Sequence, residues 1–185
     1  MVKLWYYKER NFDNAGDYYG KWLLDRLGVP NEFSMQPDII TVGSILNRRF
    51  TNNNFLVWGS GYHNPDEQFR GETTNRICAV RGKLSRAKTP YKNIPVGDPG
   101  ILAGLLQIPT TTKKYKFGII SHYWDIDEFK KLEPEVKVID MRTNDICSLL
   151  DEINECEFIF SSSLHGIIFS HSLGIPAVHL ENKPL

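Results

Sequence analysis

The chain of 185 residues balances 22 Lys and Arg against 22 Asp and Glu, and 41% of its residues are hydrophobic. This composition is typical of a globular protein with a buried core, and it excludes a disordered or low-complexity chain. The missing basic excess argues against a nucleic-acid binder, and three scattered cysteines are too few for a disulfide framework or a zinc site.

The apolar runs are too short to cross a bilayer, and the first residues lack the apolar core of a signal peptide. The sequence therefore predicts a cytoplasmic protein without a transmembrane segment. Such a protein can still associate with a membrane through a lipid-linked substrate.

The first half of the chain alternates short apolar runs with helical stretches. An aromatic-rich strand is predicted over residues 3–7, and a helix with Asp17 as its N-cap over residues 17–27. A short helix is predicted over residues 85–88. The remaining apolar runs are typical of strands covered on both faces, and they lie at residues 38–46, 54–58 and 76–81.

A polar segment at residues 108–116 predicts a linker, and a second series of elements follows it. Strands are predicted at residues 117–121, 136–140, 158–160 and 176–180. Helices are predicted at residues 146–153, capped by Asn144 or Thr143, and at 165–173.

Alternating strands and helices predict an α/β fold of two Rossmann-like units with mostly parallel sheets. We expect an N-terminal domain over residues 1–109 and a C-terminal domain over residues 110–185. The second unit is short, so we expect either that its closing helix is missing or that the chain is a fragment.

Small and polar residues follow several predicted strands, where ligands bind in open α/β sheets. After the first strand, Asn14, Gly16 and Asp17 offer a close backbone approach and the free N–H groups of a helix start. A plain N-cap turn is the alternative. Gly59 and Ser60 follow a later strand and leave room for a ligand against the backbone, with a tight turn as the alternative.

Arg81 stands at the end of the predicted strand at residues 76–81. A guanidinium group there can bind a carboxylate or a phosphate through two parallel hydrogen bonds. The alternative for Arg81 is a surface salt bridge.

The strongest candidate site joins the strand at residues 158–160 to the helix that follows. Ser161, Ser162 and Ser163 place hydroxyl groups beside the positive end of that helix, which predicts a cradle for an anion. His165 in the first turn can donate a proton to a ligand bound there, with a buried structural histidine as the alternative. The other histidines show no partner at metal-ligand spacing, so no metal is expected.

Six segments stand in an order that is diagnostic as a set. They are NAGDYYGKWLLDRLG, DIITVGSIL, VWGSGYH, AVRGKLS, VGDPGILA and SSSLHGIIFSHSLGIPAVHL. Together they resemble the polysaccharide pyruvyl transferase family, whose enzymes place pyruvate ketals on cell-surface glycans. The resemblance runs from Asn14 to about Leu180, and the SSSLHG…GIP segment is its most specific part.

The resemblance implies two Rossmann-like domains in a glycosyltransferase-B-like arrangement, with the active site between them. It implies phosphoenolpyruvate as the donor substrate and no further cofactor. The implied acceptor is a sugar of a cell-surface or exopolysaccharide precursor, carried on a lipid or a nucleotide. Family members usually extend beyond the segment at which this chain ends.

The family's motifs match this sequence residue by residue. His165 matches the essential histidine, Arg81 matches the arginine thought to hold the donor, and the N-x-G-D loop matches Asn14, Gly16 and Asp17 on the acceptor-side domain. We expect Arg81 and the serines at 161–163 to bind the carboxylate and phosphate of the donor. His165 is then the general acid, acting on the methylene carbon or on the departing phosphate.

Two other functions remain open at this point. A glycosyltransferase that uses a nucleotide-sugar donor can share the same architecture, because fold does not fix function. A non-catalytic glycan-binding remnant is the second alternative, and the aromatic residues near the N-terminus are compatible with an oligomer.

Overall fold

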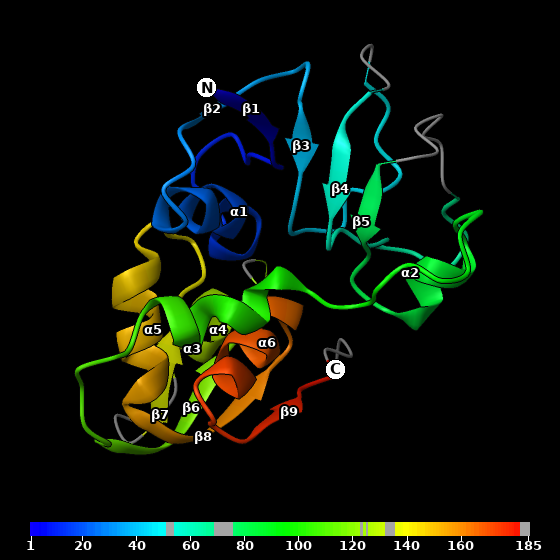
Figure 1. Cartoon of the computed structure of the whole chain (residues 1–185). Coiled ribbons are helices and arrows are strands. Elements are labelled where there is room, and N and C mark those ends of the chain that lie inside the picture. The colour runs from blue at the N-terminus through cyan, green and yellow to red at the C-terminus, as the bar shows by residue number, and fades with distance from the viewer. Residues whose placement is uncertain (51–53, 69–75, 123, 125, 132–135, 182–185) are drawn as a thin grey trace. The chain divides into compact units, whose positions relative to one another are not determined.

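The computed structural model of the protein describes residues 1–50, 54–68, 76–122, 124, 126–131 and 136–181. The chain forms two compact units, each an α/β structure built on a parallel sheet (Figure 1), which confirms the predicted fold class. The first unit comprises Met1–Arg10 and Asp17–Pro99, and the second comprises Asn11–Gly16 and Gly100–Leu185. Residues 11–16 and 100–109 thus lie with the second unit, whereas the predicted domain division places them before residue 110.

The first unit contains a five-stranded sheet with the order β2-β1-β3-β4-β5, and all its strand pairs are parallel. Its strands are β1 (Val2–Trp5), β2 (Asn31–Phe33), β3 (Ile39–Ile40), β4 (Leu56–Trp58) and β5 (Ile77–Ala79). Helix α1 (Ala15–Arg26) links β1 to β2, and helix α2 (Lys83–Ala87) follows β5.

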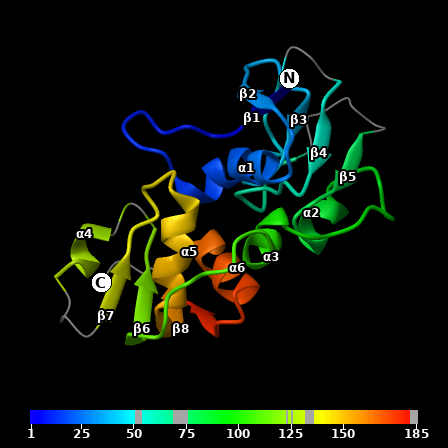
Figure 2. The ribbon, with the colours of Figure 1, turned by 60° about the vertical axis from the view of Figure 1, so that its left-hand side comes forward.

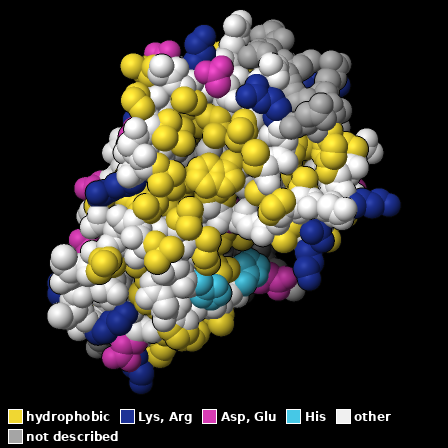
Figure 3. All heavy atoms as spheres, in the orientation of Figure 1, with side chains coloured by type: hydrophobic (Ala, Val, Ile, Leu, Met, Phe, Trp, Pro, Cys, Tyr) yellow, Lys and Arg dark blue, Asp and Glu magenta, His cyan; other side chains and the backbone are white. Residues whose placement is uncertain are grey.

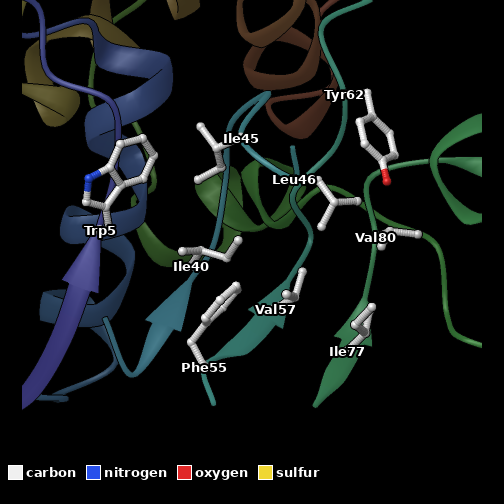
Figure 4. Packing of buried hydrophobic residues seen from close by; sticks show 9 residues of the cluster. All are labelled: Trp5, Ile40, Ile45, Leu46, Phe55, Val57, Tyr62, Ile77 and Val80. Atoms are coloured by element: carbon white, nitrogen blue, oxygen red, sulfur yellow. The ribbon is translucent and has the colours of Figure 1, made fainter. Parts of the chain in front are cut away.

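Side chains of this sheet alternate between two apolar clusters, as the period of a strand dictates. Leu4 packs on one face with Leu24 of α1, and Trp5 packs on the other. Figure 4 shows how loop residues join the strand residues in that second cluster. Both faces of the strands are therefore covered, as their continuous apolar runs predict.

The second unit contains a four-stranded parallel sheet with the order β7-β6-β8-β9. Its strands are β6 (Tyr115–Ile120), β7 (Val136–Ile139), β8 (Cys156–Ser161) and β9 (Ala177–His179). The helical segments are α3 (Ala103–Leu106), α4 (Ile126–Phe129), α5 (Ile146–Asn154), α6 (Leu164–Ser172) and η1 (Pro99–Leu102), whose first residue is the last of the first unit. Helices α5 and α6 pack on each other and on β8, along one side of the sheet (Figure 2).

Several element boundaries differ from the sequence prediction. Helix α1 begins at Ala15, so Asp17 lies in its first turn and is not the N-cap. The predicted strand at residues 38–46 shrinks to Ile39–Ile40, and Gly43, with a φ of 117°, lies within the part that is not a strand. The N-cap of α5 is Asp145, whose side chain accepts a hydrogen bond from the Ser148 N–H.

Candidate functional site

The strand order of the second sheet marks the place where a ligand is expected. After β6 the chain turns toward β7, and after β8 it turns the opposite way toward β9. Ligands of open α/β sheets bind at such a reversal, at the carboxyl ends of the two strands. His122 follows β6 and Ser162 follows β8, and the His122 backbone N–H donates a hydrogen bond of 2.9 Å to Ser162 Oγ.

His165 is the second residue of α6, the helix that starts at this reversal. Its side chain is only 9% exposed, and its ring lies 5.8 Å from that of Phe169, centroid to centroid. Because Gly166 has no side chain, α6 can pack closely on β6: a Cβ atom at Gly166 would lie 2.8 Å from Ile120 Cγ2. The first turn of α6 is thereby held against the carboxyl edge of the sheet.

Gly16 contacts the imidazole of His165 directly. A Cβ atom on Gly16 would meet Nδ1 of His165 and would lie 2.8 Å from its Cγ. The Gly16 N–H donates to Asn14 Oδ1 at 2.9 Å, and the Ala15 N–H donates to the Met141 carbonyl just after β7, at 2.8 Å. Gly16 of the predicted N-x-G-D loop therefore lines one side of the His165 imidazole.

The same loop divides between the two compact units. Asn14 and Gly16 belong to the second unit, and Asp17 belongs to the first. Asp17 lies beside Gly43, where a Cβ atom would lie 3.1 Å from Asp17 Oδ1.

The three serines before α6 differ in what their hydroxyl groups do. Ser161 is fully buried, and its Oγ lies 2.9 Å from the carbonyl oxygens of Ile120 and Ser163 and accepts the Ser163 N–H at 3.1 Å. Ser162 Oγ accepts the bond from His122. Ser163 is the N-cap of α6, and its side chain makes no cap hydrogen bond. Ser163 and the first N–H groups of α6 are therefore the donors best placed for a bound anion.

Gly59 and Ser60 of the first unit serve its own packing. Gly59 has a φ of 88°, and a Cβ atom there would lie 2.6 Å from Pro99 Cγ. Ser60 is fully buried and donates a hydrogen bond to the Thr41 carbonyl. Protein atoms therefore pack against both residues, and their part in ligand binding stays a prediction.

Arg81 lies beyond the carboxyl end of β5 with its guanidinium group fixed in place. It donates to Ser44 Oγ at 3.0 Å and to the Tyr62 carbonyl at 2.6 Å. Burial lowers the pKa of Arg81, while the carboxylates of Asp98 and Asp17 act in the opposite direction. An arginine stays charged at neutral pH, so the first unit presents an oriented guanidinium between loops at the carboxyl edge of its sheet.

Two further histidines lie at the carboxyl edge of the second sheet, and neither has a role predicted from the sequence. His122 stacks on Trp124 with a centroid distance of 6.0 Å and an interplanar angle of 7°. His179 pairs in register with Ser161 and is exposed. The sequence signal that could have identified them is their position, directly after a strand for His122 and at the end of a strand for His179. Figure 3 shows histidine side chains at the surface over α6.

The described part of the chain omits residues 51–53, 69–75, 123, 125, 132–135 and 182–185. Within it, no group of three or more His, Cys, Asp or Glu side chains is arranged to hold a metal ion. None of the helices in that part of the chain is long and apolar enough to cross a membrane.

Comparison with known proteins shows which family this chain resembles. The model of the family described as polysaccharide pyruvyl transferase matches residues 2–184. The chain is 33% identical, over 182 residues, to a protein of Acanthamoeba polyphaga mimivirus named Uncharacterized protein L143. That alignment covers 88% of this chain and 62% of the viral protein, so the chain spans less than two thirds of this relative's length.

Proposed function

Because this chain belongs to the polysaccharide pyruvyl transferase family, we propose that it transfers the pyruvyl group of phosphoenolpyruvate to two hydroxyl groups of one sugar. The product is a cyclic ketal on a precursor of a cell-surface polysaccharide. The observation that supports this reaction best is His165, which lies at the strand reversal of the second sheet with its ring set against Gly16.

The chemistry needs an acid near the methylene carbon of the donor. In the proposed reaction His165 protonates this carbon, which becomes a methyl group and leaves C2 cation-like. One sugar hydroxyl then attacks C2, the bond between C2 and the phosphate oxygen breaks, and the second hydroxyl closes the ring. Of the two hydroxyl protons, one replaces the proton that His165 gave and the other leaves with phosphate.

Anion binding at α6 would serve this step in two ways. The first N–H groups of α6 and the Ser163 hydroxyl are placed to bind a phosphate or a carboxylate. An anion held there also places the donor beside His165, the proposed general acid. Ser161 would then have a positioning role, because its buried hydroxyl ties β6 to the start of α6.

For Arg81 we propose binding of an anionic group of the donor. The hydrogen bonds to Ser44 and Tyr62 restrict its rotamers, so less conformational entropy is lost when a ligand binds. Asp98 and Asp17 already counter its charge in part. Arg81→Ala should therefore weaken phosphoenolpyruvate binding without abolishing it.

A thermal-shift titration with phosphoenolpyruvate, UDP and GDP tests the donor. Ligand at 100 times its Kd adds about 2.7 kcal/mol to the free energy of unfolding. We expect a shift with phosphoenolpyruvate that His165→Ala and Arg81→Ala reduce. His171→Ala is the matched control, since this histidine is exposed on the same helix. A shift with a nucleoside diphosphate alone would favour a nucleotide-sugar glycosyltransferase, and no shift would favour a non-catalytic glycan-binding protein.

Transfer itself is tested by phosphate release and by ketal formation on a panel of methyl hexopyranosides. His165→Ala should lower turnover by roughly 10²- to 10⁴-fold, the contribution of one well-placed general acid. A folded His165→Ala protein with wild-type turnover would exclude this role.

A further inference from the structure

Trp124 is a large aromatic side chain that the fold leaves in solvent. It is 76% exposed, whereas Trp5 and Trp22 are 8% and 9% exposed. Burying an indole would stabilise the fold, because aromatic side chains carry a large apolar surface. Its exposed surface adds little to packing and is available for contact with a ligand.

The indole is nevertheless held in a defined position. It stacks nearly parallel to the imidazole of His122, and the backbone N–H of His122 is bonded to Ser162 Oγ. Ser162 lies three residues before His165 in the same strand-to-helix connection. This series of interactions attaches the exposed ring to the connection that leads into α6, the helix that carries the proposed general acid.

We propose that Trp124, supported by His122, is the stacking platform for the sugar ring of the acceptor, an inference that rests on the proposed function. A pyranose has one face lined by C–H groups and a rim of hydroxyl groups. The C–H face packs on an indole, and the hydroxyls reach polar groups beside it.

The position favours a small ring ligand over a protein partner. Trp124 stands four residues beyond Ile120, the last residue of β6, at the edge where parallel sheets bind small molecules. A stable protein interface buries about 800 Å² on each partner, far more than a single indole offers. A nucleobase could also stack on this ring, so the test includes uridine.

Saturation-transfer NMR with methyl hexopyranosides tests the platform without requiring catalysis. We expect transfer from the wild-type protein to the C–H protons of one ring face, abolished in Trp124→Ala and partly retained in Trp124→Phe. Leu105→Ala is the matched control, because Leu105 is 79% exposed in the same unit. Equal transfer in Trp124→Ala, transfer to uridine alone, or no transfer from the wild type to any sugar would each overturn the proposal.

Kinetics separate this proposal from the proposed function. Trp124→Ala should raise the KM for the acceptor about three- to tenfold, the range of an aromatic contact, and leave the KM for phosphoenolpyruvate unchanged. An equal rise in both KM values would contradict a platform for the acceptor. If the wild-type protein bound sugar through Trp124 but never consumed phosphoenolpyruvate, the platform would be upheld and the pyruvyl transfer rejected.

Discussion

At the scale of single residues, Gly16 places the N-terminal loop in contact with His165, the proposed general acid. The sequence shows that Gly16 leaves space, and the structure shows that the imidazole of His165 fills it. The space at a glycine predicted to admit a ligand is thus occupied by a side chain, and we propose that Gly16 positions His165. The sequence could not reveal this, because the two residues lie far apart along the chain.

Substitution of Gly16 by alanine tests the positioning role. The added methyl group would displace the imidazole, and a misplacement of about 1 Å can cost about 10²-fold in rate. We therefore expect Gly16→Ala to lower kcat by about 10- to 100-fold with little change in the KM for phosphoenolpyruvate. Steady-state kinetics and the pH profile of kcat provide the measurement.

Gly82→Ala is the control for this substitution. Gly82 has an extended backbone with a φ of −159°, and a Cβ atom there would have no neighbour within 4 Å. Its kcat and pH profile should match those of the wild type. If Gly16→Ala left kcat and its pH profile unchanged, the contact with His165 would have no part in catalysis.

The serines show what residue types alone can predict. Three hydroxyls before a helix indicate anion binding, yet the structure commits the Ser161 side chain to Ile120 and Ser163 and that of Ser162 to His122. Side chains alternate along a strand, and Ser161 at the end of β8 points inward and is fully buried. Strand register, which requires the sheet, decides which hydroxyl remains for a ligand.

At the scale of elements, the sequence predicts helix α5 correctly but assigns its N-cap to the wrong residue. The periodic residues Ile146, Leu149, Leu150 and Ile153 are all buried, as predicted. The cap was expected at Asn144 or Thr143, but Asp145 occupies it. Thr143 Oγ1 accepts the Asp145 N–H at 3.0 Å instead, so neighbouring polar residues divide the hydrogen bonds of the turn between them.

Loss of this cap has a measurable effect on stability. Asp145→Ala leaves the Ser148 N–H without its acceptor, which costs about 1 kcal/mol and lowers the melting temperature by about 2–4 °C. Thermal unfolding followed by circular dichroism gives the value. Asp145→Asn keeps an acceptor oxygen and serves as the control. If both variants melted at the same temperature, the side-chain cap would not stabilise α5.

Short elements were the hardest to predict. Strand β2 is only Asn31–Phe33, with polar residues that do not indicate a strand. It forms because it pairs with β1 over Val2, Lys3 and Leu4. Helices α3 and α4 have four residues each, too few to show a helical period.

At the scale of the whole molecule, the alternation of strands and helices was enough to predict two parallel sheets. It was not enough to predict strand order, which places the reversal of the second sheet between β6 and β8. Nor did it show that Asn144 Nδ2 donates a hydrogen bond to Oδ2 of Asp13, which lies 131 residues earlier in the chain. These long-range contacts bring residues 11–16 into the second unit and to His165.

Stability at acidic pH is a property of the whole molecule, because carboxyl groups with a lowered pKa take up protons when the chain unfolds. Burial alone would raise the pKa of Asp140, but hydrogen bonds from Arg142 and Lys130 outweigh it and lower the pKa to about 2. In the unfolded chain the carboxyl group has a pKa of about 3.9. The stabilisation is therefore complete above about pH 5 and is lost as the pH falls toward 2.

Melting curves of Asp140→Asn between pH 7 and pH 2 test this linkage. At neutral pH the variant should melt about 2–4 °C below the wild type, because Arg142 and Lys130 lose a charged partner that is 31% exposed. The difference should shrink below pH 4 and vanish near pH 2, where Asp140 itself becomes protonated. Asp127→Asn, at a carboxylate that is 80% exposed, should show a small difference at neutral pH. A difference between Asp140→Asn and the wild type that stayed constant down to pH 2 would mean that the Asp140 carboxylate is not the linked group.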